Sequence, residues 1–486
     1  MKKLSKVLCL AMVASFAATA TACGGGGTSS ADPNDTRREV VFEYLDAGFG
    51  DEPYVAVADA YMAQNPDVKI TLYPNRGLRG GALGNQLATD NVAVSDIYAY
   101  QGATDVKGWA AKGYIADLTD LCNQQTLDGR TMKASMTGNA AESMTLDGKI
   151  YAIPEYTNVV GIVYNQDLFE QYNWEIPTTT KELEALCNKI ISDTNGKVTP
   201  FTWCDDADGY LYFATENWIA QYAGIADLDK FYEYSSKEIY ALEDNADGSL
   251  YTAKKNALNN LVKFFLPEND WTNAKSRETD FMDAQYGVIK GDYAMMLNGA
   301  WFENEMVLEL STEQYKDRKL GMFAIPEISD ASGAAMHSAS YTTEGGKRVL
   351  SASYEAYYFI PEKAANKDDA KDFLLYLSSK EACEIYTEHA NVVRPFDYDY
   401  GVNSEVYGKV SNFGKSVLKI ADENYLYSAT SNHALDWAGV AGMWPMGNRV
   451  ERQMLGKDAV TNPDTYLTAD YNYAKNNWDL WQQLIG

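Results

Sequence analysis

The chain has 486 residues, of which 46% are hydrophobic and 13% aromatic, and its formal net charge at pH 7 is −27. This content is typical of a globular protein, and the length exceeds one ordinary hydrophobic core, so about two to three domains are expected. A surface with this excess of negative charge repels phosphate backbones, which argues against a nucleic-acid-binding role.

The first predicted element is an N-terminal targeting segment. Three lysines precede an apolar run over residues 7–18, and Ala22 and Cys23 follow. This order is typical of a signal peptide, and the run is shorter than the ~20 residues of a transmembrane helix. The sequence at Cys23 resembles a bacterial lipobox, which implies cleavage after residues 1–22 and a lipid on the Cys23 sulfur. Residues 23–36, with four consecutive glycines, then form a flexible tether. The alternative is an ordinary secreted protein cut elsewhere.

Strand and helix patterns alternate after the tether. Apolar runs and alternation predict strands over residues 40–45, 68–72 and 96–100, and a helix is predicted over residues 53–62. Alternating strands and helices favour α/β units with parallel sheets.

Two further helices carry clear signals. Thr179 followed three residues later by Glu182 predicts a capping box at a helix start. Apolar stripes then fall at helical spacing in both helices, at Leu183, Leu186 and Ile190 in the first and at Ala370, Phe373, Leu374 and Leu377 in the second.

Four cysteines lie beyond Cys9 and Cys23. They are Cys122, Cys187, Cys204 and Cys383. None belongs to a C-x-x-C pair, so a structural zinc site is not expected. An extracytoplasmic compartment permits disulfides, but the spacing pairs no two of these residues, and we predict four buried thiols.

Catalytic and metal-binding motifs are absent from the sequence. It contains no G-x-x-x-x-G-K-[ST], G-x-S-x-G or H-E-x-x-H, and its three histidines are well separated. Two acidic loops, residues 205–209 and 244–248, resemble the start of an EF-hand loop. Thr215 and Lys254 stand where the bidentate glutamate would be, so turns are expected there and neither calcium nor a cofactor.

Several short segments occur in an order typical of a known family. They are residues 64–70, 95–98, 113–121, 147–154, 164–169, 177–179, 291–301 and 371–379. Together they resemble extracellular solute-binding proteins of the carbohydrate class, the lipoprotein receptors of ABC importers. The resemblance covers nearly the whole mature chain.

The resemblance implies an α/β fold of two lobes, the type II periplasmic-binding-protein-like fold, with ligand in a cleft between the lobes. The implied N-terminal lobe comprises residues 37–156 and 355–393, and the C-terminal lobe comprises residues 157–354 and 394–486. Chain crossings that act as a hinge are expected near residues 156–158, 351–355 and 393–395. Closure about them would bury the ligand.

A sugar offers C–H faces to aromatic rings and hydroxyls to planar polar groups. The aromatic candidates are Trp301, which matches the family pattern after Asn298, and Trp444, Trp203, Tyr210 and Trp437. The polar candidates are Asp46, Gln101, Tyr156, Asn158, Asn298, Glu355 and Arg394. Each tryptophan has the alternative of a core role, and Glu355 and Arg394 have that of a hinge ion pair. Asn158 stands where a maltose-binding protein carries a carboxylate, which argues against maltose-type specificity.

The resemblance implies a receptor that performs no chemistry. It would capture a sugar or oligosaccharide as a monomer and deliver it to the permease subunits of the importer, anchored to the outer face of the membrane through Cys23 alone. A secreted glycoside hydrolase would need two carboxylates ~5–10 Å apart, which acidic residues could supply by chance. A third reading keeps the fold but changes the cargo to a peptide or a polyamine, which an aromatic cage could bind.

Overall fold

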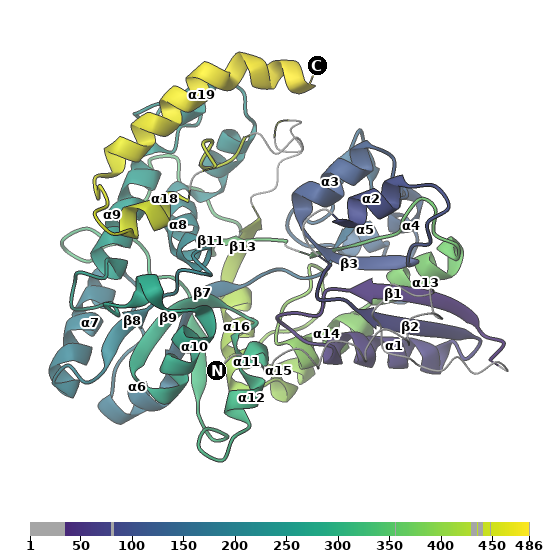
Figure 1. The fold of residues 1–486 in the computed structure, drawn as a ribbon, viewed down its shortest axis with the longest axis horizontal. Helices are drawn as coiled ribbons and strands as arrows, with labels where there is room; N and C mark the ends of the chain where they lie inside the picture. Colours follow the sequence, from purple (N-terminus) through teal and green to yellow (C-terminus); the bar gives the residue numbers. More distant parts are fainter. Residues whose placement is uncertain are drawn as a thin grey trace, which may run out of the picture. The chain divides into compact units, whose positions relative to one another are not determined.

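The computed structural model describes residues 35–78, 82–354, 356–428, 435, 441–447 and 449–485. The signal peptide, Cys9, Cys23, the tether up to residue 34, Glu355 and Trp437 lie outside this range. Residues 36–486 form one unit by their contacts, which is drawn in Figure 1. Within the described residues, no helix combines the length and apolar character that crossing a membrane requires.

The first sheet contains five strands in the order β2-β1-β3-β12-β6. They are β1 (Arg38–Tyr44), β2 (Val68–Pro74), β3 (Ile97–Gln101), β6 (Ile153–Pro154) and β12 (Ala356–Phe359). β1 is parallel to β2 and β3, as predicted, but β12 runs antiparallel to β3 and β6. β12 enters this sheet from a chain crossing and not through a helical crossover, so its direction is not restricted to parallel.

The second sheet contains four strands in the order β10-β7-β9-β8. They are β7 (Val160–Asn165), β8 (Thr199–Thr202), β9 (Tyr293–Gly299) and β10 (Leu320–Phe323). Only β8 and β9 are parallel, and β7 pairs antiparallel with both of its neighbours. The prediction of parallel sheets is therefore wrong for this sheet. Two small pairs complete the strands, β4 (Thr145–Leu146) with β5 (Lys149–Ile150) and β11 (Arg348–Ala352) with β13 (Asn424–Ser428).

Helices cover both faces of the first sheet, with α1 and α13 on one side and α2 and α3 on the other (Figure 1). The helices of this part are α1 (Glu52–Gln64), α2 (Ala82–Ala88), α3 (Ala103–Ala111), α4 (Thr119–Cys122), α5 (Met132–Ser135), α13 (Lys367–Leu377), α14 (Lys380–Ala390) and α15 (Glu405–Lys409). The apolar stripe predicted in α13 is buried at all four positions, which confirms that helix and its core-facing side.

A larger set of helices accompanies the second sheet. They are α6 (Gln166–Tyr172), α7 (Thr180–Thr194), α8 (Tyr210–Tyr232), α9 (Tyr251–Phe265), α10 (Phe281–Lys290), α11 (Phe302–Glu305), α12 (Val307–Leu310), α16 (Asn412–Glu423), α18 (Val450–Leu455) and α19 (Pro463–Ile485), with 3-10 turns η1 (Lys237–Tyr240) and η2 (Ser276–Glu278). The predicted capping box at the start of α7 is confirmed. The Glu182 N–H donates to Thr179 Oγ1 at 3.3 Å, and the Thr179 N–H donates to Glu182 Oε2 at 3.2 Å.

Three segments that connect the two sheets are hydrogen-bonded to one another. The backbone hydrogen bonds run from Glu155 to the Ala356 carbonyl (2.9 Å), from Asn158 to the Ser353 carbonyl (2.9 Å) and from Thr157 to the Val393 carbonyl (2.8 Å). These are the segments predicted as chain crossings. Residues 155–158 are hydrogen-bonded to both of the other segments, so they lie between them.

The four described cysteines are buried, and both acidic loops form contacts with other protein groups. All four described cysteines are buried, free thiols, as predicted, and burial raises the pKa values of Cys122, Cys204 and Cys383 to about 12. In the first acidic loop, Asp208 forms an ion pair with Arg449 at 2.7 Å. In the second, Asn245 Oδ1 accepts hydrogen bonds from two backbone N–H groups of its own turn, at residues 247 and 249.

Candidate functional site

A cavity of about 490 Å³ lies where the chain crossings meet residues of both sheets. Its described lining comes from the segment after β1, the carboxyl end of β3, the crossing at residues 155–160, the first turns of α8, α11 and the adjoining ends of β11 and β12. Strand ends leave side chains of different segments facing one space, which is the usual position of a ligand site in α/β proteins.

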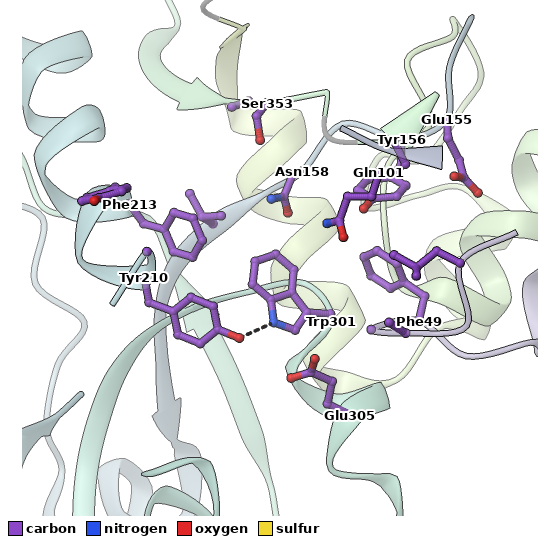
Figure 2. A pocket seen from close by; sticks show the side chains of 18 of the residues that line it. Phe49, Gln101, Glu155, Tyr156, Asn158, Tyr210, Phe213, Trp301, Glu305 and Ser353 are labelled. Carbon is purple, nitrogen blue, oxygen red and sulfur yellow. Dashed lines mark hydrogen bonds between the residues drawn. The ribbon is translucent and has the colours of Figure 1, made fainter. Parts of the chain in front are cut away.

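One wall of the cavity is aromatic. Tyr210 and Phe213 lie one turn apart on α8, and their ring centroids are 5.5 Å apart with nearly parallel planes. The Trp301 ring is 5.8 Å from each of them, and its indole N–H donates to the Tyr210 hydroxyl at 3.1 Å (Figure 2). The hydrogen bond holds Trp301 at one orientation, so the wall presents fixed ring surfaces to the cavity.

A second pair of rings comes from the other side of the crossing. Phe49 packs edge-on against Tyr156, with ring centroids 5.0 Å apart. Gly48 and Gly50 on either side of Phe49 both have positive φ, at +65° and +73°. Glycine is the residue that adopts these angles without strain, so the turn places Phe49 beside the first crossing.

Polar side chains face the aromatic wall. Gln101 ends β3, while Asn158 and Ser353 belong to two crossings that are hydrogen-bonded to each other through their backbones. Figure 2 shows the side chains of these three residues above the Trp301 ring. The cavity therefore combines flat apolar surfaces with hydroxyl and amide groups, which can both donate and accept hydrogen bonds.

Three described carboxylates also line the cavity, at Glu155, Glu216 and Glu305. Burial raises the pKa of Glu155, while the Arg394 guanidinium and the neighbouring tyrosine hydroxyls act in the opposite direction. Glu155 Oε1 accepts hydrogen bonds from the Tyr386 hydroxyl at 2.9 Å and from the Tyr358 hydroxyl at 3.1 Å. These contacts fix the carboxylate at the end of the first sheet.

Five of the residues predicted from the sequence line this cavity. They are Gln101, Tyr156, Asn158, Tyr210 and Trp301. They come from four separate segments of the chain, and the fold brings them together around one space.

Trp203 and Asn298 lie away from the cavity. Trp203 is buried in the core of the second sheet, and its indole N–H donates to the Phe265 carbonyl at 2.9 Å because the ring turns toward α9. Asn298 is fully buried in β9 and donates to Gln285 at 3.1 Å, which places it behind the cavity wall.

Arg394 is 1% exposed and does not reach the cavity lining. Its guanidinium donates to the Tyr358 hydroxyl at 2.9 Å and packs over the Tyr386 ring at 4.6 Å. Its carboxylate neighbour is Glu155. The Arg394 guanidinium acts to lower the pKa of Glu155, and the Glu155 carboxylate acts to raise the pKa of Arg394. Arg394 therefore contacts Tyr358 and Tyr386 beside the Glu155 carboxylate rather than the cavity, while Glu355, considered as its ion-pair partner, lies outside the described residues.

Trp444 and Asp46 are also placed outside the described lining. The Trp444 ring lies 5.2 Å from Lys254 Nζ, and this buried ammonium donates to the Met443 carbonyl at 2.8 Å. Asp46 forms an ion pair with Arg76 at 2.8 Å, although the residues on either side of Asp46 reach the cavity. The two remaining candidates, Glu355 and Trp437, lie outside the described residues.

Several lining residues had no sequence signal strong enough to single them out. They are Phe49, Tyr54, Phe213, Glu216, Glu305 and Ser353. Phe213 and Glu305 could have been found by helical spacing from Tyr210 and Trp301, since positions three and four apart share a helix face. No group of histidine, cysteine and acidic residues that could hold a metal ion occurs in the described part of the chain.

Comparison with known proteins decides the family. The family described as bacterial extracellular solute-binding protein matches residues 50–382. The chain belongs to this family. Members of the family are binding proteins, and this solute-binding protein has the two-lobe α/β fold predicted from its sequence.

Curated relatives share limited identity with this solute-binding protein. The multiple sugar-binding protein of Streptococcus mutans is 22% identical over 330 residues, which cover 67% of this chain and 68% of that protein. An uncharacterised ABC transporter extracellular-binding protein of Pyrococcus horikoshii is 21% identical over 306 residues, which cover 61% of this chain and 64% of that protein.

Solved structures cover more of the chain. A chitin oligosaccharide binding protein has a TM-score of 0.63 at 16% identity and covers 90% of this chain and 98% of its own. The raffinose complex of the binding protein RafE has a TM-score of 0.58 at 17% identity and covers 89% and 99%. The GacH receptor of Streptomyces glaucescens, described unliganded and with acarbose, has a TM-score of 0.59 at 17% identity and covers 90% and 98%. At these identities the likeness concerns the fold.

Proposed function

We propose that this solute-binding protein captures a sugar or oligosaccharide and delivers it to the permease of an ABC importer. The observation that carries the proposal is the wall of Trp301, Tyr210 and Phe213 opposite the polar side chains of Gln101 and Asn158. Ring faces suit the C–H faces of a sugar, and amide groups suit its hydroxyls. The names of the relatives, which bind sugars, support the same cargo.

The proposed lobes are residues 37–156 with 355–393 and residues 157–354 with 394–486. The hydrogen-bonded segments at residues 155–158, 353–356 and 393 support a hinge at their boundary. Rotation about these segments would change the width of the cavity, because its walls come from both sides of them. We propose that the form closed around ligand is the one that the permease recognises.

We propose that the cavity is a receptor site rather than the active site of a hydrolase. The Glu155 carboxylate accepts hydrogen bonds from the buried Tyr358 and Tyr386 hydroxyls beside Arg394, which supports a structural role for this residue. A capture role needs only reversible binding, so we propose that the protein performs no catalysis. Incubation with oligosaccharides followed by analysis of the products tests this, and any cleavage product would overturn it.

A thermal-shift screen of residues 37–486 tests the cargo. The panel contains monosaccharides, raffinose, xylotriose, maltotriose, diacetylchitobiose, amino acids, short peptides and spermidine. A compound present at 100 times its dissociation constant adds ~2.7 kcal/mol to the unfolding free energy. A shift confined to one glycan series would support the proposal, and shifts confined to peptides or spermidine would overturn the sugar cargo.

A matched pair of variants connects the shift to the cavity. Trp301→Ala removes a ring that lines the cavity, whereas Trp271→Ala removes a ring whose indole N–H donates to Asn188 away from it. At the same sugar concentration, we expect the sugar-induced shift to become clearly smaller only in Trp301→Ala. Equal loss in both variants would mean that the sugar binds elsewhere.

We propose further that the protein is a monomer held at the outer face of the membrane by a lipid on Cys23. The support is the sequence Ala22-Cys23 after a signal-peptide pattern. Expression of the full chain and of Cys23→Ser in a bacterium tests the anchor. The wild-type protein should be recovered with membranes and the variant in the soluble fraction, and a variant that remains with the membranes would contradict a single lipid anchor.

A further inference from the structure

A carboxylate lies beside the ring of Trp301 in the cavity wall. Glu305 follows Trp301 by four residues, and its backbone N–H donates to the Trp301 carbonyl at 2.9 Å. Residues four apart share one face of a helix, so the ring and the carboxylate point to the same side. Both side chains line the cavity, and Figure 2 shows the Glu305 carboxylate close to the edge of the indole. The two groups therefore form one surface.

The orientation of the Glu305 carboxylate is set by a chain of hydrogen bonds that begins at the backbone. The Gly299 N–H, which can only donate, donates to Asn298 Oδ1 at 2.8 Å. The Asn298 amide must then turn its NH₂ group toward Gln285, and Gln285 Oε1 accepts from it at 3.1 Å. The donor at Gly299 thus determines which end of the Asn298 amide donates, and with it which atom of Gln285 accepts.

The second half of the chain reaches the cavity. Because Gln285 Oε1 is already an acceptor, its NH₂ group is the end that faces Glu305, and it donates to Glu305 Oε2 at 3.2 Å. Asn298 and Gln285 are both fully buried, so water does not compete for their amides. We name these two residues the amide relay. It holds the Glu305 carboxylate as a hydrogen-bond acceptor at a fixed angle.

We propose that Glu305 is a specificity-determining residue that recognises a hydroxyl group at the edge of the sugar ring packed on Trp301. Asn298 and Gln285 are its positioning residues. The inference rests on the proposed sugar-binding function. When the C–H face of a sugar packs on an indole, its equatorial hydroxyls project from the ring edge, and Glu305 stands at that edge. A hydrogen bond to a carboxylate is stronger than a neutral one, so a sugar that lacks the hydroxyl loses a strong contact that the site was shaped to make.

Titration calorimetry with deoxy sugars tests this assignment. The probes are raffinose, xylotriose, maltotriose and diacetylchitobiose, followed by each monodeoxy derivative of whichever of the four binds the wild-type protein most tightly. In the wild-type protein, removal of the recognised hydroxyl should weaken binding by about 10-fold or more. In Glu305→Ala the same deoxy sugar should bind within about 2-fold of its parent, while the penalties at the other hydroxyls stay as in the wild-type protein.

Two further variants examine the relay and the loss of charge. Gln285→Met keeps the length of the side chain but cannot donate to Glu305, so the penalty at the recognised hydroxyl should fall to about 3-fold. Glu309→Gln in α12 is the control, because it removes one charge near Glu305 from a side chain outside the described lining of this cavity. It should behave as the wild-type protein. If Glu305→Ala does not fold, the nearly isosteric Glu305→Gln takes its place, and the penalty at the recognised hydroxyl should then fall to about 3-fold, because the amide still forms a neutral hydrogen bond.

Each outcome bears on a different part of the proposal. If the thermal-shift panel shows binding only of peptides or spermidine and none of sugars, the proposed sugar cargo is overturned, and the inference with it. If sugars bind but Glu305→Ala shows the same deoxy penalties as the wild-type protein, the role of Glu305 is overturned and the proposed function stands. If Glu305→Ala removes one penalty but Gln285→Met leaves that penalty unchanged, the positioning role of the relay is overturned.

Discussion

The ring of Trp301 lies directly against Gly299, so that a β-carbon built on Gly299 would be 2.1 Å from Cζ3 of the indole. Real Cβ atoms do not approach another heavy atom this closely. The absence of a side chain at Gly299 is therefore what allows the indole to occupy its place in the cavity wall. Since the same glycine donates the first hydrogen bond of the amide relay, it fixes both the ring and the carboxylate beside it.

The first prediction concerns this contact. Gly299→Ala should displace the Trp301 ring and weaken sugar binding about as much as Trp301→Ala, because either change removes the same ring face from the cavity. The matched control is Gly108→Ala in α3, where an added β-carbon meets nothing within 4 Å. Calorimetry with the sugar found in the thermal-shift screen measures the effect. Wild-type affinity in Gly299→Ala would show that the ring is not needed where it lies.

A second prediction separates two tryptophans that follow neighbouring strands. Trp301→Ala should weaken sugar binding by ~1–2 kcal/mol and leave the fold intact, because aromatic residues of a binding site contribute on this scale. Trp203→Ala should instead lower the unfolding free energy by ~3–5 kcal/mol, because it leaves a cavity in the core and removes the partner of the Phe265 carbonyl. Urea unfolding and calorimetry on both variants check the contrast, which would fail if Trp203→Ala weakened binding without lowering stability.

The third prediction concerns the buried pair at the hinge. Arg394→Met leaves Glu155 buried without its cation and should lower the unfolding free energy by ~3–5 kcal/mol. Glu155→Gln leaves Arg394 uncompensated and should also be destabilising. In the double variant neither charge remains, so the combined loss should be smaller than the sum of the two by at least ~1 kcal/mol. Urea unfolding of the four proteins measures this, and strict additivity would mean that the two residues do not interact.

The fourth prediction is a dependence of stability on pH. Burial raises the pKa of Glu451 from 4.5 to about 7, and neighbouring Glu216 and Asp470 act in the same direction. The folded protein therefore holds a proton on Glu451 that the unfolded chain releases near pH 4.5. This contribution to stability is complete below pH 4.5 and is lost as the pH rises to about 7, by roughly 3 kcal/mol in total.

Glu451→Gln should remove that contribution to the pH dependence. Melting temperatures measured at pH 5 and pH 8 should fall less between the two values in the variant than in the wild-type protein. The exposed Glu423 provides the control, since Glu423→Gln removes a carboxylate at the surface of α16. Equal changes with pH in the wild-type protein and Glu451→Gln would contradict the raised pKa.

Local patterns in the sequence predicted the elements of the fold more reliably than their directions. The alternation at residues 68–72 and the capping box at Thr179 depend only on neighbouring residues, and both are confirmed. The antiparallel direction of β12 depends on where the chain re-enters the first sheet, which no local pattern encodes. The prediction of parallel sheets was therefore right for β1 to β3 and wrong for most pairs of the second sheet.

The candidate site shows the same limit. Tyr156 and Asn158 were proposed because they follow a strand at a crossing, and both line the cavity. Trp203 also follows a strand, yet its ring turns into the core toward α9. Sequence places a residue at the end of a strand but does not say to which side its ring turns, because packing against distant helices decides that. Family resemblance pointed to Trp301 and Tyr210, which line the cavity, but also to Trp203 and Trp444, which do not belong to its described lining.

The buried thiols have a practical consequence for the use of this protein. Since Cys122, Cys187, Cys204 and Cys383 are all buried and unpaired, the body formed by residues 37–486 does not depend on oxidation to fold and can be prepared under reducing conditions. A cysteine introduced at an exposed position of the cavity rim would then be the thiol that a maleimide dye reaches first. The chain thus offers a scaffold for a fluorescent reporter that carries one dye at a chosen position and responds to its own solute.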